Sequence, residues 1–353
     1  MDTAEKSDIR KLSREALRTF FTENGEQAFR GNQVYEWLWQ KGAHSFEAMT
    51  NLSLAHRELL NTHFTINHIA VDQMQRSTDG TIKNAVRLHD GLIVESVLIP
   101  TESRTTACVS SQVGCSLDCR FCATARLKRM RNLNPDEIFD QVVVIDRQSR
   151  LYFGRPLSNI VFMGMGEPLM NYPNVVKAIR MISSEEGLGM SPKRITVSTS
   201  GVPKMIRKLA DEALRCNLAV SLHSAVEETR TEIMPFNAKM PLQDLKESIV
   251  YWYDKTRSRI TYEYVVWEGI NDAPADIRAF LDFCKAAPCK VNLIEYNPID
   301  DGEFRQAPEQ AVQAYVRALE AAGITVTVRR SRGKDIDAAC GQLANKGSGD
   351  NRA

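Results

Sequence analysis

No apolar run in this 353-residue chain approaches the roughly 20 residues of a membrane-spanning helix. The N-terminal segment, MDTAEKSDIRKLSREAL, also lacks the apolar core and the cleavage site of a signal peptide. We therefore expect a cytoplasmic protein with no membrane attachment. The sequence has no internal repeat and no low-complexity tract, which is typical of a globular chain. The chain also has no excess of charge of either sign, since 45 Lys and Arg residues nearly balance 44 Asp and Glu residues. The formal net charge of +1 therefore favours no particular partner.

Cysteine is the first feature that the chain does have. A reducing cytoplasm keeps thiols free, so its eight cysteines are better explained as metal ligands, catalytic groups or buried packing than as a disulfide framework. Four lie in CVSSQVGCSLDCRFC, from Cys108 to Cys122, and Cys340 stands alone in DIDAACGQL. Cys216, Cys284 and Cys289 match no motif, and we interpret them as structural.

Changes in pattern along the chain predict four parts. Residues 1–65 have helical spacing in SREALRTFFTENG, NQVYEWLWQKG and LSLAHRELLNTHF, which predicts a small helical accessory domain. Residues 66–100 alternate apolar and polar positions between the turn signals STDG and HDG, and predict a short β connection. Residues 101–340 form the largest part, and 341–353 predict a mobile polar tail.

The largest part alternates strand-like with helix-like segments. The strand-like segments are TTACVSSQ, NIVFMG, RITVSTS, NLAVSLH, ITYEYVV, KVNLIEY and ITVTVRR. The helix-like segments between them are NPDEIFDQVVVIDRQSR, YPNVVKAIRMISSEEG, VPKMIRKLADEALR, LQDLKESIVYWYDKT, APADIRAFLDFCKAA and APEQAVQAYVRALEAAG. This order predicts an α/β fold with parallel strands. An incomplete (β/α)6 barrel fits six units and a closing strand better than a doubly wound sheet, although periodicity does not separate the two. In a barrel, the chemistry belongs at the carboxyl ends of the strands.

The thiols have a spacing that suits a metal centre. Cys115, Cys119 and Cys122 form C-x3-C-x2-C, and three thiolates can hold three irons of a [4Fe-4S] cluster while the fourth iron stays open to a ligand. The alternative is a zinc site with Cys108 or Cys340 as fourth ligand. A basic run lies beside each cysteine loop and suits a polyanionic substrate, although a solvated surface explains either run equally well. The runs are Arg126, Lys128, Arg129 and Arg131, and Arg329, Arg330, Arg332 and Lys334.

With Phe121 before the last cysteine, the motif C-x3-C-x-F-C resembles that of the radical S-adenosylmethionine superfamily. GMGEP, residues 164–168, resembles the turn with which that superfamily contacts the methionine moiety, which implies that Gly166 and Glu167 bind the cofactor. The resemblance implies a [4Fe-4S] cluster held by the three cysteines and two molecules of S-adenosylmethionine per turnover.

A closer resemblance covers the chain from about Leu12 to Ala344. CVSSQVGCSLDCRFC, RNLNPDEIFDQV, SNIVFMGMGEPLMNY, ITVSTSG, SLHS, NLIEYNP and DIDAACGQL together are similar to the adenine-C2 RNA methyltransferases, which modify 23S ribosomal RNA and certain transfer RNAs. FRGNQVYEWLWQKGAHSFEAMTNLS resembles the accessory domain of that family. One departure is CATARLKRMRNL, where Lys128 and Arg129 stand in place of a glycine and an aromatic residue.

This resemblance implies roles for individual residues. Cys340 would accept a methyl group as a thiolate, Cys108 would release the product by attacking the Cys340 sulfur, and Glu95 would accept the carbon-2 proton. Further contacts to S-adenosylmethionine would come from Ser198, Ser221, Leu222, His223 and Asn297. Taken alone, Cys108 is more simply a small core residue, Glu95 an exposed strand position and His223 a satisfied histidine at a strand end.

The expected partners are 23S ribosomal RNA, transfer RNA and a one-electron reductant such as flavodoxin or ferredoxin, and we expect a monomer. Two alternatives stay open on the sequence. The sister chemistry at carbon 8 of the same adenine, associated with antibiotic resistance, uses the same cluster and both thiols. A zinc-stabilised RNA-binding protein without catalysis would leave GMGEP, Cys108 and Cys340 without a role.

Overall fold

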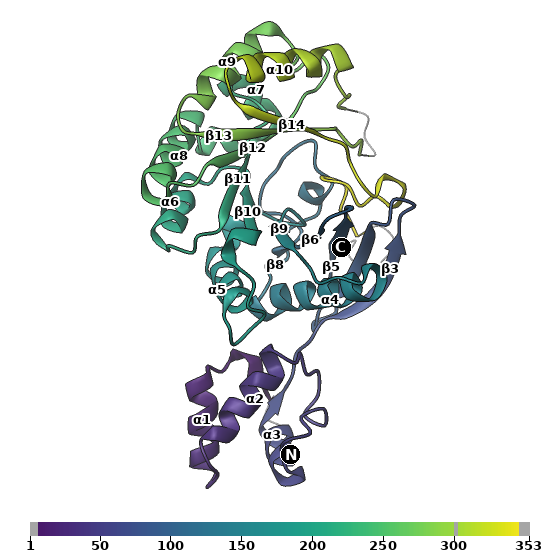
Figure 1. Cartoon of the computed structure of the whole chain (residues 1–353), viewed down its shortest axis with the longest axis vertical. Helices are drawn as coiled ribbons and strands as arrows, with labels where there is room; N and C mark the ends of the chain where they lie inside the picture. Colours follow the sequence, from purple (N-terminus) through teal and green to yellow (C-terminus); the bar gives the residue numbers. More distant parts are fainter. Residues whose placement is uncertain (1–5, 300–302, 346–353) are drawn as a thin grey trace.

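The computed structural model describes residues 6–299 and 303–345. The N-terminal part contains α1 (Arg14–Glu23), α2 (Phe29–Trp39) and α3 (Leu54–His63). It lies at the bottom of Figure 1, below the large sheet. Ser13 and Ser53 cap α1 and α3, because each hydroxyl accepts a hydrogen bond from the backbone N–H three residues further along. The short strands β1 (Ser7–Asp8) and β2 (Phe64–Thr65) pair in parallel, so they bring the two ends of this part together.

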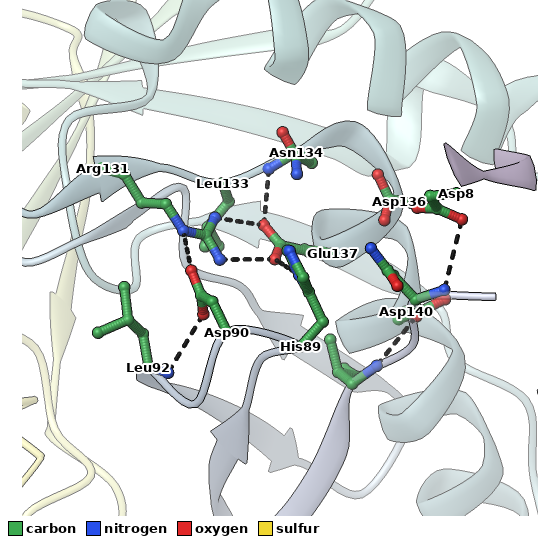
Figure 2. Close-up of polar contacts among 12 residues, drawn as sticks. Asp8, His89, Asp90, Leu92, Arg131, Leu133, Asn134, Asp136, Glu137 and Asp140 are labelled. Atoms are coloured by element: carbon green, nitrogen blue, oxygen red, sulfur yellow. Dashed lines mark hydrogen bonds and ion pairs between the residues drawn. The ribbon is translucent and has the colours of Figure 1, made fainter. Parts of the chain in front are cut away.

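A buried ion pair joins the N-terminal part to the rest of the chain. Arg10 donates to both carboxylate oxygens of Asp140 in α4 (Pro135–Phe153), at 2.7 and 2.8 Å, and its guanidinium lies 4.8 Å from the Trp39 ring centroid. Asp8 and Asp136 lie near the same junction, to the right in Figure 2. Burial raises the pKa of Asp136 to about 6; the charge of Arg10 opposes this shift and that of Asp8 adds to it.

We expect Asp136→Asn to stabilise the protein at neutral pH. The pKa of Asp136 is raised from 3.8 to about 6, so the folded state binds this proton more tightly than the unfolded state. Wild-type stability should therefore fall as the pH rises from about 4 to about 6. Two pH units correspond to at most about 3 kcal/mol, which the Asp136→Asn variant would recover above pH 6 but not below pH 4.

Urea unfolding of the metal-free variant and wild type at several pH values measures this gain. The exposed Asp244 in α8 (Leu242–Thr256) is a matched control, because Asp244→Asn should change stability little at any pH. An equal effect of Asp136→Asn at pH 4 and pH 8 would contradict the assignment.

One ten-stranded sheet organises the remainder, in the order β14-β13-β12-β11-β10-β9-β6-β5-β4-β3. From β6 to β14 every neighbouring pair is parallel, whereas β3, β4, β5 and β6 pair antiparallel. The strands are β3 (Ala70–Arg76), β4 (Ile82–Arg87), β5 (Ile93–Pro100), β6 (Thr105–Cys108), β9 (Asn159–Phe162), β10 (Ile195–Thr199), β11 (Asn217–Ser221), β12 (Ile260–Val265), β13 (Cys289–Ile294) and β14 (Thr325–Arg329). The predicted α/β fold, an incomplete barrel with a helical N-terminal part, is confirmed.

Helices cover the outside of this sheet, as Figure 1 shows for α5, α6, α8 and α9. After α4 they are α5 (Tyr172–Ser183), α6 (Pro203–Asp211), α7 (Glu227–Ile233), α8, α9 (Pro274–Cys284) and α10 (Glu309–Ala321). The six predicted helices are present, and α7 was not predicted. Within the described residues, no helix is both long enough and apolar enough to cross a membrane.

The segment 66–100 contains strands, as predicted, and β5 pairs with β6, so these strands extend the main sheet. The first residues of the predicted tail are bonded to the sheet and the cysteine loop: Ala344 and Asn345 donate backbone hydrogen bonds to Glu95, and Thr124 donates to the Leu343 carbonyl at 2.6 Å. Residues 346–353 lie outside the described residues.

Candidate active site

The carboxyl ends of the parallel strands surround one large cavity of about 1080 Å³, measured to its open mouth. Most of the predicted site residues line it, although they are up to 225 positions apart, because neighbouring parallel strands end at the same edge of a sheet. They are Cys115, Cys119, Cys122, Gly166, Glu167, Ser198, Ser221, His223, Asn297 and Cys340. Leu222 is not in the lining, since its side chain is fully buried in the core.

The cysteine loop lies between β7 (Gln112–Val113) and β8 (Arg131–Asn132), a short hairpin that was not predicted. The unpredicted α7 and the following 3-10 helix η5 (Pro235–Lys239) hold this loop from the other side. Arg120 donates its backbone N–H to the Ile233 carbonyl at 3.0 Å, and the Asp118 carboxylate accepts from the Phe236 N–H at 2.9 Å. Burial raises the pKa of Cys115 to about 12, so a bound metal is needed to keep its thiol ionised.

The GMGEP turn brings backbone and a carboxyl group to the cavity wall. Gly166 has φ +91°, and a Cβ there would lie 2.5 Å from the Gln112 Cβ, so only glycine fits this position. The buried Glu167 accepts hydrogen bonds from the backbone N–H groups of Leu169 at 3.0 Å and Ser200 at 2.8 Å. Burial raises the pKa of Glu167, although these hydrogen bonds oppose the shift.

His223 lies two residues after β11, the fourth parallel strand, and is neutral there. Its Nδ1 accepts from the Val265 N–H at 3.2 Å, and burial lowers the pKa of His223 to about 3, with the charge of Arg230 adding to the effect. Asn297 lies near the lone cysteine, since its Nδ2 donates to the Cys340 carbonyl at 3.3 Å. Because His223 Nδ1 accepts the hydrogen bond from Val265, it carries no proton, and His223 cannot act as an acid through that atom.

Cys108 and Cys340 line a second, smaller cavity together with Arg329 and Leu343. Cys340 also lines the large cavity, so it connects the two. Burial and the nearby Cys340 raise the pKa of Cys108 to about 12, and the charge of Arg329 opposes this. Burial of its sulfur likewise raises the pKa of Cys340, although the residue as a whole is exposed to solvent. The charge of Arg329 again opposes the shift. Arg329 also pairs with Glu263, with 3.4 Å between Nη1 and Oε2.

Glu95 lines neither cavity. Its carboxylate lies 3.4 Å from the Lys83 ammonium and accepts hydrogen bonds from the backbone N–H groups of Ala344 at 2.8 Å and Asn345 at 3.1 Å. It is therefore fully buried rather than exposed on its strand, and it holds the segment that follows Cys340.

The two predicted basic runs are only partly free to meet a polyanion. Arg131 lies between two carboxylates in Figure 2, 2.6 Å from Asp90 and 2.8 Å from both oxygens of Glu137. Glu137 in turn accepts from the Asn134 N–H and contacts His89. In the second run Arg329 and Lys334 are likewise paired with carboxylates. Lys334 is exposed despite its ion pair, and Arg126, Lys128, Arg129, Arg330 and Arg332 are exposed as well.

Sequence reasoning missed three charged residues around the site. Arg230 in α7 and Glu263 in β12 are buried, and Lys83 in β4 is buried against Glu95. Lys83 and Glu263 are charges at inner positions of strands, and such a position was the only signal that could have marked them. Arg230 lies in the polar segment EETRTEI, where nothing in the sequence marks it as buried.

Comparisons with known proteins agree with this geometry. The family model "Ribosomal RNA large subunit methyltransferase N-terminal domain" matches residues 7–66, and "Radical SAM superfamily" matches residues 109–284. A solved radical SAM methyltransferase from Sphaerobacter thermophilus superposes with a TM-score of 0.90 at 37% identity, over 96% of this chain and 99% of that one. The fold and site therefore define a radical S-adenosylmethionine enzyme.

Two curated relatives narrow this class. The probable dual-specificity RNA methyltransferase RlmN of Flavobacterium johnsoniae is 71% identical over 97% of this chain and 98% of its own length. The dual-specificity RNA methyltransferase RlmN of Syntrophus aciditrophicus is 43% identical over 96% of this chain and 97% of its own length. The chain belongs to the RlmN family of RNA methyltransferases. This membership removes the support for a non-catalytic zinc protein.

Membership implies a [4Fe-4S] cluster and S-adenosylmethionine, and the residues present fit both. Cys115, Cys119 and Cys122 line one cavity, where thiolates can hold three irons and leave one open. In the described part of the chain, no three His, Cys, Asp or Glu side chains are gathered to bind a single metal ion. The Gly166 turn and the Glu167 carboxyl lie in the same cavity, so backbone and acid groups are available to an amino group.

Proposed function

We propose that this chain methylates carbon 2 of an adenine in 23S ribosomal RNA and in transfer RNA, by way of a methyl group carried on Cys340. One observation carries the proposal. Cys340 lines both the cavity that contains the three cluster cysteines and the smaller cavity that contains Cys108. A methyl group on its sulfur would thus lie where a radical can be made, and a second thiol lies where the product must be released.

The chemistry of adenine explains why two thiols are needed. Carbon 2 is electrophilic, so it does not attack the methyl group of a sulfonium ion. When bound, the cluster and S-adenosylmethionine supply the one-electron cleavage that allows hydrogen to be removed from a methyl group. Cys340 accepts that methyl group by displacement, and the thiolate it needs is favoured by the charge of Arg329.

Release from RNA is the role proposed for Cys108. Its thiolate would attack the Cys340 sulfur, break the bond from sulfur to the methylene carbon and leave a disulfide between Cys108 and Cys340. The electron pair of the broken bond would stay with the carbon and the adenine ring, and the carbon would take up a proton to become the methyl group. A reducing cytoplasm would then restore both thiols. Arg329 lies against this cavity, so its charge would stabilise whichever of the two sulfurs is ionised.

Glu95 is proposed as the acceptor of the carbon-2 proton, a role that requires movement. Its carboxylate is now bonded to the N–H groups of Ala344 and Asn345. Release of the segment after Cys340 would uncover it. Gly166, Glu167, Ser198, Ser221, His223 and Asn297 are proposed as contacts to S-adenosylmethionine, since all line the large cavity. Leu222 could contribute only its backbone, because its side chain is in the core.

The proposed partners are RNA and a one-electron reductant such as flavodoxin or ferredoxin, with the chain acting as a monomer in the cytoplasm. Residues 1–65 are proposed as an accessory domain that contacts RNA. The exposed Lys128 and Arg129 lie beside the cluster loop and would meet phosphates near the cavity mouth. An adenine in folded RNA would have to leave its stack to reach the site.

Mass spectrometry of adenine nucleosides tests the function. Ribosomal RNA and transfer RNA from a strain that lacks the gene would be incubated with anaerobically reconstituted protein, reductant and methyl-labelled S-adenosylmethionine. We expect labelled 2-methyladenosine in both RNAs. Labelled 8-methyladenosine would assign the chain to the sister chemistry, and no methyladenosine from iron-loaded protein would reject both.

A further inference from the structure

Arg230 in α7 is a buried cation that the proposed chemistry does not use. Its exposed fraction is 0%, and its side chain donates to three oxygens that carry no charge. Nε donates to the Leu222 carbonyl at 3.1 Å, Nη2 to the Ser200 carbonyl and Nη1 to the Asn237 amide oxygen. Across the described ranges, 6–299 and 303–345, no carboxylate lies within ion-pair distance of this guanidinium, whereas Arg10, which is also buried, is paired with Asp140.

A buried charge without a counter-ion is unfavourable, because the protein interior solvates it poorly. Burial accordingly lowers the pKa of Arg230 to about 10, although the nearby Cys119 thiol opposes this shift more than Glu227 does. The contacts between α7, η5 and the cysteine loop show which group can supply the missing negative charge.

The chain keeps Arg230 close to that loop by direct contacts. Ile233, three residues further along α7, accepts from the Arg120 N–H, and the guanidinium lies 5.5 Å from the ring centroid of Phe236, whose N–H is bonded to Asp118. Cys119, Ile233 and Phe236 also share one apolar cluster, which excludes water from the space between helix and loop. In such a medium of low dielectric constant, the charge of the guanidinium acts strongly on the neighbouring cysteine loop.

We propose that Arg230 is the counter-charge of the iron–sulfur cluster and raises its reduction potential. Three thiolates make the cluster site anionic, and reduction adds one further negative charge, so a buried cation favours the reduced form. The inference rests on the proposed function, since it requires that Cys115, Cys119 and Cys122 hold a cluster. It adds a positioning residue that touches none of the reacting atoms.

The same guanidinium also fixes two strand ends of the cavity. Its carbonyl partners, Ser200 and Leu222, follow β10 and β11, and the Ser200 N–H binds the Glu167 carboxylate. A substitution could therefore disturb the site by geometry as well as by charge. The experiment has to separate these two effects.

A redox titration of the reconstituted cluster, followed by electron paramagnetic resonance, measures the potential directly. We expect Arg230→Gln to shift the midpoint to a more negative value and Arg230→Lys to retain most of the wild-type value. The matched control is Arg120→Gln, which removes a half-exposed arginine of the cysteine loop that is already paired with Glu232 and Glu303. Its shift should be much smaller, because solvent and carboxylates screen its charge.

Iron and sulfide content, measured first, separates the possible failures. Wild-type protein without a cluster would overturn the proposed function and this inference together. A wild-type cluster whose potential is unchanged in Arg230→Gln would overturn the inference alone. Loss of iron from Arg230→Gln and Arg230→Lys alike, at normal iron content in Arg120→Gln, would show a structural role and would also overturn it.

A second variant keeps Arg230 in place and neutralises it. Asn237 accepts from Arg230 and donates to the Glu227 carboxylate at 2.5 Å, so Asn237→Asp combined with Glu227→Gln exchanges the two groups without changing the net charge. The carboxylate then contacts the guanidinium. We expect the midpoint to become more negative here too, and an unchanged midpoint would overturn the proposal even if Arg230→Gln does not fold.

Discussion

Cys340→Ala should abolish methyl transfer to RNA and to the protein alike. The side chain of Cys340 reaches both cavities, and among the described residues no other cysteine does. The variant should leave the cluster site intact, because Cys115, Cys119 and Cys122 are held by separate contacts to α7 and η5. We expect loss of all detectable turnover at unchanged iron content.

One methyl label, measured on the protein and on RNA, distinguishes this loss from misfolding. With methyl-labelled S-adenosylmethionine, the wild-type protein should become labelled before RNA is added, and Cys340→Ala should not. Cys216→Ala is the matched control, since it removes a buried thiol that lines neither cavity and should keep the label on both. Labelled RNA from Cys340→Ala would show that the methyl group does not pass through this thiol.

Local patterns explain why much of the fold and site could be predicted. The pattern within a short segment is enough to predict a helix or a strand of the barrel. The predicted alternation from β6 to β14 and the six predicted helices therefore agree with the structure. The C-x3-C-x2-C spacing and GMGEP are also local. Because parallel strands end at one edge, knowledge of the fold was enough to gather Cys115, Glu167 and Ser198 into one cavity.

Contacts between distant segments explain the rest. Glu95 gave the pattern of an exposed strand residue, but Lys83 and the backbone of Ala344 bury its charge, and that backbone lies 249 residues away. Arg131 belongs to one of the basic runs, yet its guanidinium is bonded to the carboxylates of Asp90 and Glu137. No pattern within a segment records such partners, so a charge in sequence does not show whether it will face solvent or another charge.

The short α7 was missed for a related reason. Its seven residues, EETRTEI, are too few and too polar for helical periodicity, although it carries Arg230 and supports the cysteine loop. A short helix in a protein owes its stability to tertiary contacts rather than to its own propensity. Its presence follows from the packing of Ile233 and Phe236 against Cys119, which only the folded chain shows.

Cys108→Ala should separate the two halves of the reaction. Cys340 keeps its place beside both cavities in this variant, so it should still accept the methyl group and become joined to RNA. Without the second thiol the bond from its sulfur cannot be broken, and we expect a single turnover that ends in a stable covalent adduct of protein and RNA. Cys108 is suited to the attack because it shares the smaller cavity with Cys340 and Arg329.

Denaturing gel electrophoresis of labelled RNA measures the adduct as a band of reduced mobility that nuclease removes. Cys108→Ala combined with Cys340→Ala is the control, since it keeps the first substitution and lacks the attachment point, and it should give no such band. Mass spectrometry of the digested adduct should place the nucleotide on Cys340. Normal multiple turnover by Cys108→Ala would instead mean that a different group releases the RNA, because a thiol that is not required for release cannot be the one that attacks the Cys340 sulfur.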